Sequence, residues 1–559
     1  MSLMKKRILI VGGVAGGASC AARLRRLDED AEIIIFERGS YVSFASCGLP
    51  YHVGSVIRNE RDLVVAEPDM FQKRFNIEVR LQSEVVSINR ADGEIEVRGL
   101  LSGKLYREKY NALVLAPGAA PMRPPLPGID QPGIFTLRTI PDSRTIRDWI
   151  EKKGAHSAVI AGGGFIGLEM AENLAARGLK VTIVEMLNQL LPPLDPEMAA
   201  LVTGHLTARG VNVSLGDGVT AFEQCPQDRI AVQLRSGVRH ETDLVVLAIG
   251  VRPEASLAKA AGLKIGERGG IRVGANMRTS DPRIWAVGDA VEVQDMITGQ
   301  WSLLPLAGPA NRQGRVAADS ICGRMSSFRG VLGTAICSTF GLAAAMTGAS
   351  EKSLKCFGMT DYEKIYLHPR QHANYFPGSK PLHLKLLYRK SNGEILGAQA
   401  VGEDGVDKRI DLISFALQKK GTVFDLEQAE LCYAPQFGAA KDAINMAGMI
   451  AANNLRGDAP IAGWESLAAN GVLVLDVREA DEFREGHVPE ATNIPLGSLR
   501  QSLAKLPRER TISVYCGVGQ RAYYASRLLK QRGFRVQNLS GGYRTFLQFR
   551  DAGLFNGKW

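Results

Sequence analysis

Two glycine-rich turns, each set between an apolar strand and a helix, constrain the fold of this chain more than any other feature. The first follows the strand in "RILIVGGVAGGASCAARLRRL", and Glu37 ends the next apolar strand, "EIIIFER", twenty residues beyond Gly17. Such glycines let the backbone approach a pyrophosphate, the helix N-terminus faces its charge, and the acid binds a ribose hydroxyl. Val14 replaces the middle glycine of the usual pattern. The turn therefore contains four other glycines: Gly12, Gly13, Gly16 and Gly17.

A second copy of this arrangement lies further along the chain. The stretch "SAVIAGGGFIGLEMAENLAARGLKVTIVEM" has the full spacing at Gly162, Gly164 and Gly167, and Glu185 ends its second strand. Two copies, each with strand, helix and terminal acid in place, predict two dinucleotide-binding folds in one chain. An acid at the second site repels a 2′-phosphate, so Glu185 favours NADH over NADPH.

Two further strips carry a family resemblance. "NALVLAPGAAP" (111–121) predicts a buried strand running into a Pro-Gly turn, and "TSDPRIWAVGDA" (279–290) predicts another that ends in Gly-Asp. With the two glycine turns, in this order, they resemble the pyridine nucleotide–disulphide oxidoreductases over about residues 5–450. The resemblance implies that the first turn binds FAD, the second binds NADH, and Asp289 reaches the ribityl chain of the flavin. The cofactor contacts expected on this basis are Gly12, Gly13, Gly16, Gly17, Glu37, Arg38, Pro117, Gly118, Gly162, Gly164, Gly167, Glu185, Gly288 and Asp289.

A single cysteine, Cys47, lies among aromatic and small residues in "YVSFASCGLPYHVG". Most members of the family carry two redox cysteines spaced C-x4-C, but Val42 stands five positions before Cys47, which excludes an internal disulfide from this motif. Cys47 must therefore act alone, cycling between a thiolate and a mixed disulfide, a persulfide or a sulfenic acid. Such a nucleophile needs a lowered pKa, and a helix N-terminus beside an electron-accepting flavin would favour the thiolate.

The surroundings of Cys47 resemble one branch of the family. "SFASCGLPY" is similar to the single-cysteine branch, which contains coenzyme A–disulfide reductases, NADH peroxidases and NADH oxidases. "HANYFPG" and "LCYAPQFGAAKDAIN" resemble the dimerisation domain of the coenzyme A–disulfide reductases. This resemblance implies that Tyr375 and Tyr433 reach the cysteine of the other subunit, and that Lys441 contacts a ligand phosphate. Ser46 stands where the reductases usually have asparagine, which leaves thiol specificity open.

Coenzyme A carries phosphates, so cations are expected near the cysteine and the first helix. Arg23 and Arg26 lie three apart on that predicted helix, and hence on one face of it. The residues expected to bind the thiol substrate are Arg23, Arg26, Ser43, Ser46 and Lys441.

The C-terminal end carries a second cysteine of interest. After a Gly-Asp-Ala-Pro linker near 457–460, a buried strand delivers Cys516 to a tight loop, "CGVGQR", and a helix follows from about Ala522. The N–H groups of such a loop form a nest that lowers the thiol pKa and stabilises an anion or persulfide. The "DVRE", "GHVPEATNIP", cysteine-loop and "GGY" segments resemble, in order, the rhodanese sulfurtransferases. The loop from Cys516 to Arg521 has six residues, one fewer than in related phosphatases, which favours a sulfur substrate.

These patterns predict an α/β chain with two dinucleotide-binding (Rossmann-like) domains, an α+β dimerisation domain and a C-terminal rhodanese-like α/β domain. The expected boundaries are 1–120 and 251–328 for the FAD domain, 121–250 for the NADH domain, 329–452 for the dimerisation domain, 453–461 for a linker and 462–559 for the rhodanese domain.

Composition limits the partners. The net charge of +10 suits anionic ligands, but basic residues are dispersed among acids, so no nucleic-acid partner is expected. No apolar run is long enough to span a bilayer, and no secretion signal is evident. Eight cysteines without a CxxC pair fit a reducing compartment. We expect a cytoplasmic protein with no membrane partner and no metal site.

Together these features suggest a homodimeric reductase that uses NADH and FAD to reduce coenzyme A disulfide, coenzyme A persulfide or polysulfide at Cys47. Cys516 and Arg521 would form a sulfurtransferase site, with coenzyme A as the sulfur carrier. Two alternatives stay open. One is an NADH oxidase or peroxidase in which Cys47 cycles through a sulfenic acid. The other is a redox sensor or sulfur-carrier protein whose turnover is incidental.

Overall fold

A computed structural model describes residues 5–468 and 471–555 of the chain. It divides into two compact units: unit 1 extends to Met186 and adds Asp217–Val331, whereas unit 2 holds Leu187–Gly216 and the chain from Leu332 onward. Residues 187–216, which lie inside the expected NADH domain, thus cluster with unit 2. The ends of the expected outer domains, residues 1–4 and 556–559, lie outside the described residues, and the domain boundaries stay predictions.

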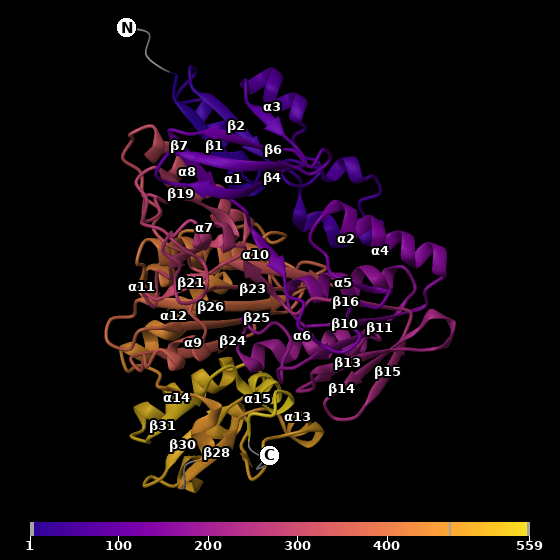
Figure 1. The fold of residues 1–559 in the computed structure, drawn as a ribbon. Helices are drawn as coiled ribbons and strands as arrows, with labels where there is room; N and C mark the ends of the chain where they lie inside the picture. Colours follow the sequence, from indigo (N-terminus) through magenta and orange to yellow (C-terminus); the bar gives the residue numbers. More distant parts are fainter. Residues whose placement is uncertain (1–4, 469–470, 556–559) are drawn as a thin grey trace. The chain divides into compact units, whose positions relative to one another are not determined.

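Unit 1 contains a parallel sheet of five strands in the order β19-β7-β1-β2-β3 (Figure 1). Ile8, Leu9 and Ile10 in the central strand are fully buried, because sheets of this kind are covered on both faces. Two helices, α1 (Ala15–Arg25) and α8 (Ala307–Ile321), pack against each other beside this sheet. The strands are β19 (Ile284–Ala286), β7 (Ala112–Leu115), β1 (Arg7–Val11), β2 (Glu32–Phe36) and β3 (Glu78–Arg80).

The second glycine turn belongs to another parallel sheet of unit 1, with the neighbours β11-β10-β16-β9. The turn leads from β10 into α5 (Phe165–Ala176), which repeats the strand-turn-helix order of the first sheet. Its strands are β11 (Lys180–Glu185), β10 (Ser157–Ala161), β16 (Leu244–Leu247) and β9 (Ile134–Phe135). Unit 1 also contains α2 (Leu49–Val53), α3 (Pro68–Phe75), α4 (Ile140–Lys153), α7 (Ser256–Ala260), β4 (Ser83–Asn89), β5 (Glu94–Gly99), β6 (Leu105–Lys109), β8 (Ala119–Pro121), β13 (Val219–Gln224), β14 (Ile230–Leu234), β15 (Arg239–Thr242), β17 (Val251–Pro253), β18 (Ile271–Arg272), β20 (Val291–Gln294) and β21 (Trp301–Leu303).

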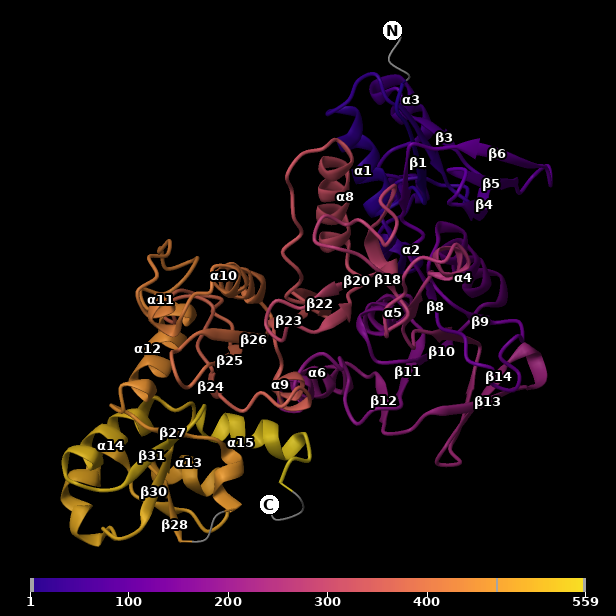
Figure 2. The ribbon, with the colours of Figure 1, turned by 60° about the vertical axis from the view of Figure 1, so that its left-hand side comes forward.

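Unit 2 is built around an antiparallel sheet in the order β22-β23-β26-β25-β24, with helices α10, α11 and α12 beside it (Figure 2). Every residue of β26 is buried, as expected for a strand covered on both faces. The elements are β22 (Ala335–Thr339), β23 (Leu342–Gly348), β26 (Ile395–Gly402), β25 (Leu382–Tyr388), β24 (Glu363–Leu367), α6 (Pro196–Ala208), β12 (Asn212–Leu215), α9 (Glu351–Cys356), α10 (Val406–Gln418), α11 (Val423–Glu427) and α12 (Ala443–Leu455).

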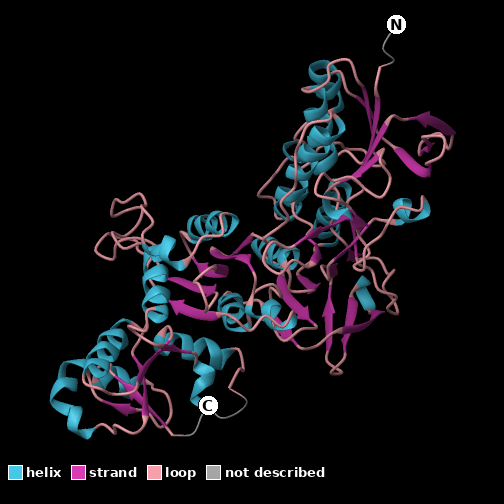
Figure 3. Cartoon of the chain, turned by 90° about the vertical axis from the view of Figure 1, so that its left-hand side faces the viewer, coloured by secondary structure: helices cyan, strands magenta, loops and turns pink. Residues whose placement is uncertain are grey.

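The C-terminal part of unit 2 is a parallel sheet in the order β27-β31-β30-β28-β29, with helices on both sides (Figure 3). The segment expected to be a linker is ordered at both ends, because α12 continues to Leu455 and the Ile461 N–H donates to Asn454 Oδ1 at 3.0 Å. The elements are β27 (Ile461–Ala462), β31 (Val536–Leu539), β30 (Thr511–Tyr515), β28 (Val472–Asp476), β29 (Thr492–Asn493), α13 (Ala480–Glu485), α14 (Gln520–Gln531) and α15 (Gly542–Asp551).

The predicted α/β class is confirmed by this architecture. Across residues 5–468 and 471–555, no helix combines the length and the apolar character needed to cross a bilayer.

Candidate active sites

The first glycine turn is shaped for close approach of a ligand backbone. Gly12 has a φ of +94°, and a Cβ there would lie 2.1 Å from the Ala116 carbonyl oxygen, so only glycine fits. A Cβ at Gly17 would lie 1.9 Å from the Gly12 oxygen. The Glu37 carboxylate accepts the Gly13 N–H at 2.9 Å and thereby fixes the acid beside the turn. These residues fit a dinucleotide such as FAD.

Other expected FAD contacts already have protein partners. Arg38 donates to both carboxylate oxygens of Glu254, at 2.8 and 2.7 Å. Glu254 also accepts from Arg138, which donates to the Pro117 carbonyl at 3.2 Å. The charge of Arg38 is therefore balanced within the chain. Arg38 and Glu254 are 216 positions apart, so local sequence does not reveal this ion pair.

The remaining expected flavin contacts lie at three glycines and one acid. Gly118 and Gly288 have φ values of +78° and +83°. The Gly288 N–H donates to Gln313 Oε1 at 2.7 Å, and burial raises the pKa of Asp289 beside it. A Cβ at Gly16 would lie 2.9 Å from the Val287 side chain. The contacts of these residues with FAD stay predictions.

The second glycine turn repeats the first. Gly162 has a φ of +109°, and a Cβ on Gly167 would lie 2.1 Å from the Gly162 oxygen. Gly164 precedes α5 as its N-cap. The buried Glu185 carboxylate accepts the Gly163 N–H at 2.7 Å, as Glu37 does in the first turn. This turn fits a second dinucleotide, while the expected contact of Glu185 with its ribose stays a prediction.

Cys47 is exposed in a short 3₁₀ turn, Ser46–Gly48, immediately before α2. Its pKa is raised, first by desolvation and then by the charge of Glu169. Among the chain's own groups, desolvation and the charge of Glu169 thus outweigh the hydrogen bonds that lower this pKa. The predicted stabilisation of the thiolate beside a bound flavin stays a prediction. Burial raises the pKa of Glu169 itself to about 7. Glu169 lies two residues beyond the last glycine of the second turn, Gly167, but its effect on Cys47 depends on tertiary structure.

The expected substrate contacts of unit 1 differ in how they are held. Arg23 donates to Asp319 at 3.0 and 2.8 Å, so its charge is already paired. Helix α1 ends at Arg25, and the exposed Arg26 is its C-cap. Ser46 is exposed next to Cys47. Ser43 has a φ of +48° and donates its N–H to the Gly13 carbonyl at 2.8 Å. Contacts of these residues with coenzyme A stay predictions.

In unit 2 the two expected tyrosines lie together. Tyr375 Oη and Tyr433 Oη are 2.6 Å apart. Tyr375 is 75% exposed and Tyr433 is 49% exposed. The hydrogen bond to Tyr433 raises the pKa of Tyr375. Lys441 is exposed further along the same segment, and Phe437 is 67% exposed. The pair thus presents two hydroxyls on the surface, and its predicted action on the other subunit's cysteine stays a prediction.

The C-terminal cysteine loop directs one backbone N–H toward the cysteine sulfur, and the full nest of N–H groups stays a prediction. Cys516 follows β30 and is only 1% exposed, and the Gly519 N–H points to its Sγ at 3.2 Å. The Tyr543 N–H donates to the Cys516 carbonyl at 2.7 Å, so the first turn of α15 supports the loop from behind. Helix α14 begins at Gln520, two residues before the predicted start. The loop is suited to hold sulfur with excess negative charge.

Arg521 has a partner that the sequence did not indicate. Its guanidinium donates to both carboxylate oxygens of Glu482, at 2.6 and 2.7 Å. This bond lowers the pKa of Glu482 to about 2. Arg521 also faces Cys516. Its predicted stabilisation of the Cys516 thiolate stays a prediction, and a carboxylate shares its charge.

Two histidines connect the cysteine loop to the segment that carries Tyr375. His368 and His383 stand at the ends of that segment, with their Nδ1 atoms 2.9 Å apart. His368 Nε2 lies 2.8 Å from Thr545 Oγ1, on the helix that supports the Cys516 loop. Burial lowers the pKa of both rings, that of His383 to about 4, so both are neutral near pH 7.

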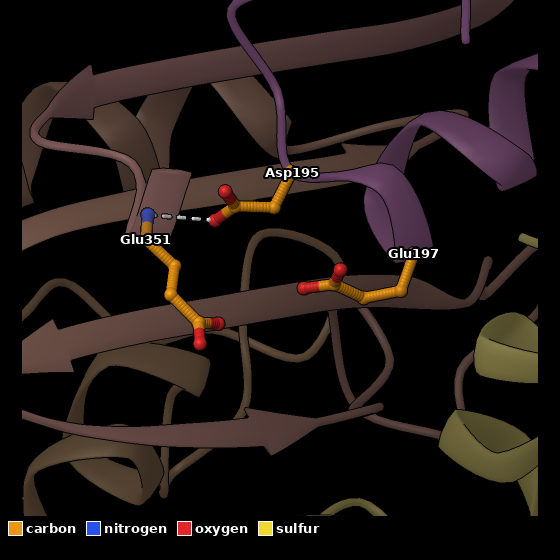
Figure 4. A group of neighbouring side chains, drawn as sticks. All are labelled: Asp195, Glu197 and Glu351. Carbon is orange, nitrogen blue, oxygen red and sulfur yellow. Dashed lines mark hydrogen bonds between the residues drawn. The ribbon is translucent and has the colours of Figure 1, made fainter. Parts of the chain in front are cut away.

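Three buried carboxylates converge on one space in unit 2 (Figure 4). Asp195 and Glu197 come from the start of α6, and Glu351 begins α9. Carboxylates grouped in this way suit a hard cation. However, Lys385 Nζ lies 2.5–3.0 Å from an oxygen of each, so an ammonium already balances them. Tyr366 donates to Glu197 at 2.8 Å, and its N–H donates to Ser540 Oγ of the C-terminal sheet domain at 2.8 Å. We assign the cluster a structural role.

Comparison with known families covers nearly the whole chain. Residues 6–314 match the family described as pyridine nucleotide-disulphide oxidoreductase, and residues 334–444 match the dimerisation domain of that family. Residues 463–548 match the rhodanese-like domain.

Individual relatives agree with these matches. The coenzyme A disulfide reductase of Staphylococcus haemolyticus is 33% identical over 444 residues, covering 79% of this chain and 98% of that protein. A structure of reduced Bacillus anthracis CoADR-RHD is 45% identical with a TM-score of 0.95, covering 97% of this chain and 98% of that one. An NAD-dependent persulfide reductase from A. fulgidus is 36% identical with a TM-score of 0.90, covering 97% and 100%. The latter two comparisons extend over the C-terminal domain.

Proposed function

The chain belongs to the pyridine nucleotide-disulphide oxidoreductase family, and from that premise we propose that it reduces coenzyme A disulfide or coenzyme A persulfide with NADH and FAD. It is an oxidoreductase of this family with a C-terminal rhodanese-like domain. The observation that carries the proposal is the exposed Cys47, which has no second cysteine at the C-x4-C spacing. The full-length similarity to the CoADR-RHD structure and to the persulfide reductase supports it.

The proposed chemistry at Cys47 is thiol–disulfide exchange. FAD and NADH, when bound, would supply two electrons. The Cys47 thiolate attacks one sulfur of coenzyme A disulfide, forms a mixed disulfide and releases one coenzyme A thiolate. With coenzyme A persulfide the same attack on the inner sulfur releases hydrosulfide. Two electrons then cleave the mixed disulfide, which regenerates the Cys47 thiolate and a second coenzyme A thiolate.

The tyrosine pair supports a homodimer. Tyr375 and Tyr433 expose their hydroxyls at the surface of the domain that matches the family's dimerisation domain. We propose that they face Cys47 of the other subunit and donate hydrogen bonds to the departing thiolate. A pair held at 2.6 Å can pass a proton between its two oxygens, which suits release of a thiol.

We propose that Cys516 loads the carrier. Its thiolate takes a sulfane sulfur from a donor, and a coenzyme A thiol then takes up that sulfur as coenzyme A persulfide. The Gly519 N–H beside Cys516 Sγ supports this role, because such a donor stabilises the negative charge of a bound persulfide. The long pantetheine arm of coenzyme A would carry sulfur from Cys516 to Cys47.

Two measurements test this function. Cys516→Ala should abolish sulfur transfer from polysulfide to coenzyme A but spare NADH-dependent reduction of coenzyme A disulfide. Loss of both activities would show that the two sites are not independent. Anaerobic NADH consumption separates the alternatives, since an oxidase or peroxidase needs oxygen or peroxide and a sensor shows one stoichiometric burst.

A further inference from the structure

The loop around Cys516 offers little positive charge to a substrate. The residues between Cys516 and Arg521 are Gly517, Val518, Gly519 and Gln520, all uncharged. Arg521 is the first cation of the loop, and two oxygens of Glu482 already accept from it. A bidentate arginine–carboxylate pair of this geometry occupies two of the five guanidinium N–H donors and offsets the charge that would otherwise attract an anion.

Two further arginines, Arg478 and Arg544, lie near the loop and have other contacts. Arg478 donates to Asp476 at 2.7 Å and lies over the Tyr543 ring, 4.3 Å from its centroid. Arg544 donates its backbone N–H to the Gly517 carbonyl, and its exposed side chain acts on the buried histidine pair.

Glu482 is held firmly beside Arg521. Its Oε2 accepts from Arg521 at 2.6 Å and from the Glu479 N–H at 3.1 Å, as part of the capping box of α13. The carboxylate stays ionised at neutral pH, so a dianion entering the loop would meet a negative charge at 2.6–2.7 Å from the guanidinium it needs. Val518, 39% exposed, offers an apolar contact at the same loop.

We propose that the Glu482–Arg521 ion pair makes the Cys516 loop select sulfane sulfur attached to an uncharged alkyl group, as in a persulfide, over the dianion thiosulfate. This inference rests on the proposed function and names its donor class. In a persulfide the group next to the attacked sulfur is a thioalkyl chain, and the phosphates of coenzyme A lie at the far end of the pantetheine arm. In thiosulfate that neighbouring group is a sulfonate.

The transfer balances with either donor. The Cys516 thiolate attacks the terminal sulfur of the persulfide, a new S–S bond forms at Cys516, and the donor S–S bond breaks. The alkyl thiolate leaves with the electron pair and takes up the persulfide proton. With thiosulfate the leaving group is sulfite, which carries two charges past Glu482. No net oxidation or reduction occurs in either case.

The test is the rate at which Cys516 gains one sulfur atom in the full-length protein, followed by peptide mass spectrometry. The donors are thiosulfate and pantetheine persulfide, which lacks the phosphates of coenzyme A. Wild type should react at least about tenfold faster with pantetheine persulfide. Glu482→Gln keeps a capping side chain and should raise the thiosulfate rate about tenfold, while the persulfide rate changes less than about twofold.

A second variant and a matched control secure the result. Val518→Lys places a new cation in the loop and should also raise the thiosulfate rate. Asp481→Asn removes an exposed acid, with 79% of its side chain accessible, from the same helix and should change neither rate. Equal rates for the two donors in wild type, or equal effects of Glu482→Gln and Asp481→Asn, would overturn the selectivity. Loading of Cys516 by neither donor would overturn the sulfurtransferase function itself, and the selectivity with it.

Discussion

Lys385→Met should destabilise unit 2 far more than a matched change at an exposed lysine. The Lys385 side chain is fully buried, with its ammonium 2.5–3.0 Å from three carboxylate oxygens. At an effective dielectric constant of about 20, each contact gives roughly 6 kcal/mol of gross attraction, most of which the cost of desolvation offsets. Removing one partner from a buried ion pair costs about 3–5 kcal/mol, because uncompensated charge remains. We therefore expect Lys385→Met to lower the free energy of unfolding by about 3–5 kcal/mol.

The matched control is Lys355→Met. The Lys355 ammonium lies 2.8 Å from Glu351, one of the same carboxylates, but 65% of its side chain is exposed. Exposed pairs of this kind contribute about 0–1 kcal/mol. Urea denaturation followed by far-UV circular dichroism gives the midpoint of each variant. Similar midpoints for the two variants would show that burial of the Lys385 ammonium does not stabilise unit 2.

The pH dependence gives an independent check. Burial alone would raise the pKa of Glu351, but Lys385 and Lys364 hold it below its usual range. A carboxyl group with a lowered folded pKa stabilises the fold above its unfolded pKa and loses that effect as pH falls. Without Lys385 the pKa of Glu351 should rise, so its buried carboxyl becomes neutral more readily as the pH falls. The stability difference between Lys385→Met and wild type should therefore shrink from about pH 7 towards pH 5. Mg²⁺ should also restore part of the stability that Lys385→Met loses, since the three carboxylates offer oxygens within 4.8 Å of one another.

Three further outcomes are expected. Glu185→Ala should narrow the preference for NADH over NADPH in initial-rate measurements, and a wild-type preference for NADPH would mean that this acid does not face the ribose. Tyr433→Phe should slow release of thiol from the Cys47 adduct without preventing adduct formation in stopped-flow experiments; a wild-type rate would argue against a proton-donor role. Because burial lowers the pKa of His383 to about 4, its neutral ring stabilises the fold above pH 6.5, and that contribution should be lost as pH falls towards 4. His383→Gln should flatten the plot of Tm against pH between pH 6.5 and 4. An unchanged slope would show that His383 does not cause this loss of stability.

The features that the sequence predicted well are those encoded over short stretches. Each glycine turn, with its strand, helix and terminal acid, lies within about 30 residues in a dinucleotide-binding fold, so spacing alone carries its geometry. The Cys516 loop is similar, because a strand, six loop residues and a helix define its nest. The fold class followed from these local units.

The features that the sequence did not predict depend on residues that are far apart in the chain and meet only in the folded structure. Asp195 and Lys385 are separated by 190 positions, and neither has a local signature of a buried ion cluster. The pairing of Arg521 with Glu482 spans 39 positions and changes the charge that the loop presents. The raised pKa of Cys47 has the same origin, because the fold partly desolvates the thiol and brings Glu169 near it.

The most direct test of the central claim is anaerobic NADH consumption with coenzyme A disulfide by wild type and by Cys47→Ser. If Cys47 carries the reduction, wild type turns over steadily and the variant does not, while NADH still bleaches the flavin absorbance of both proteins. Turnover by Cys47→Ser at the wild-type rate would contradict this role of Cys47.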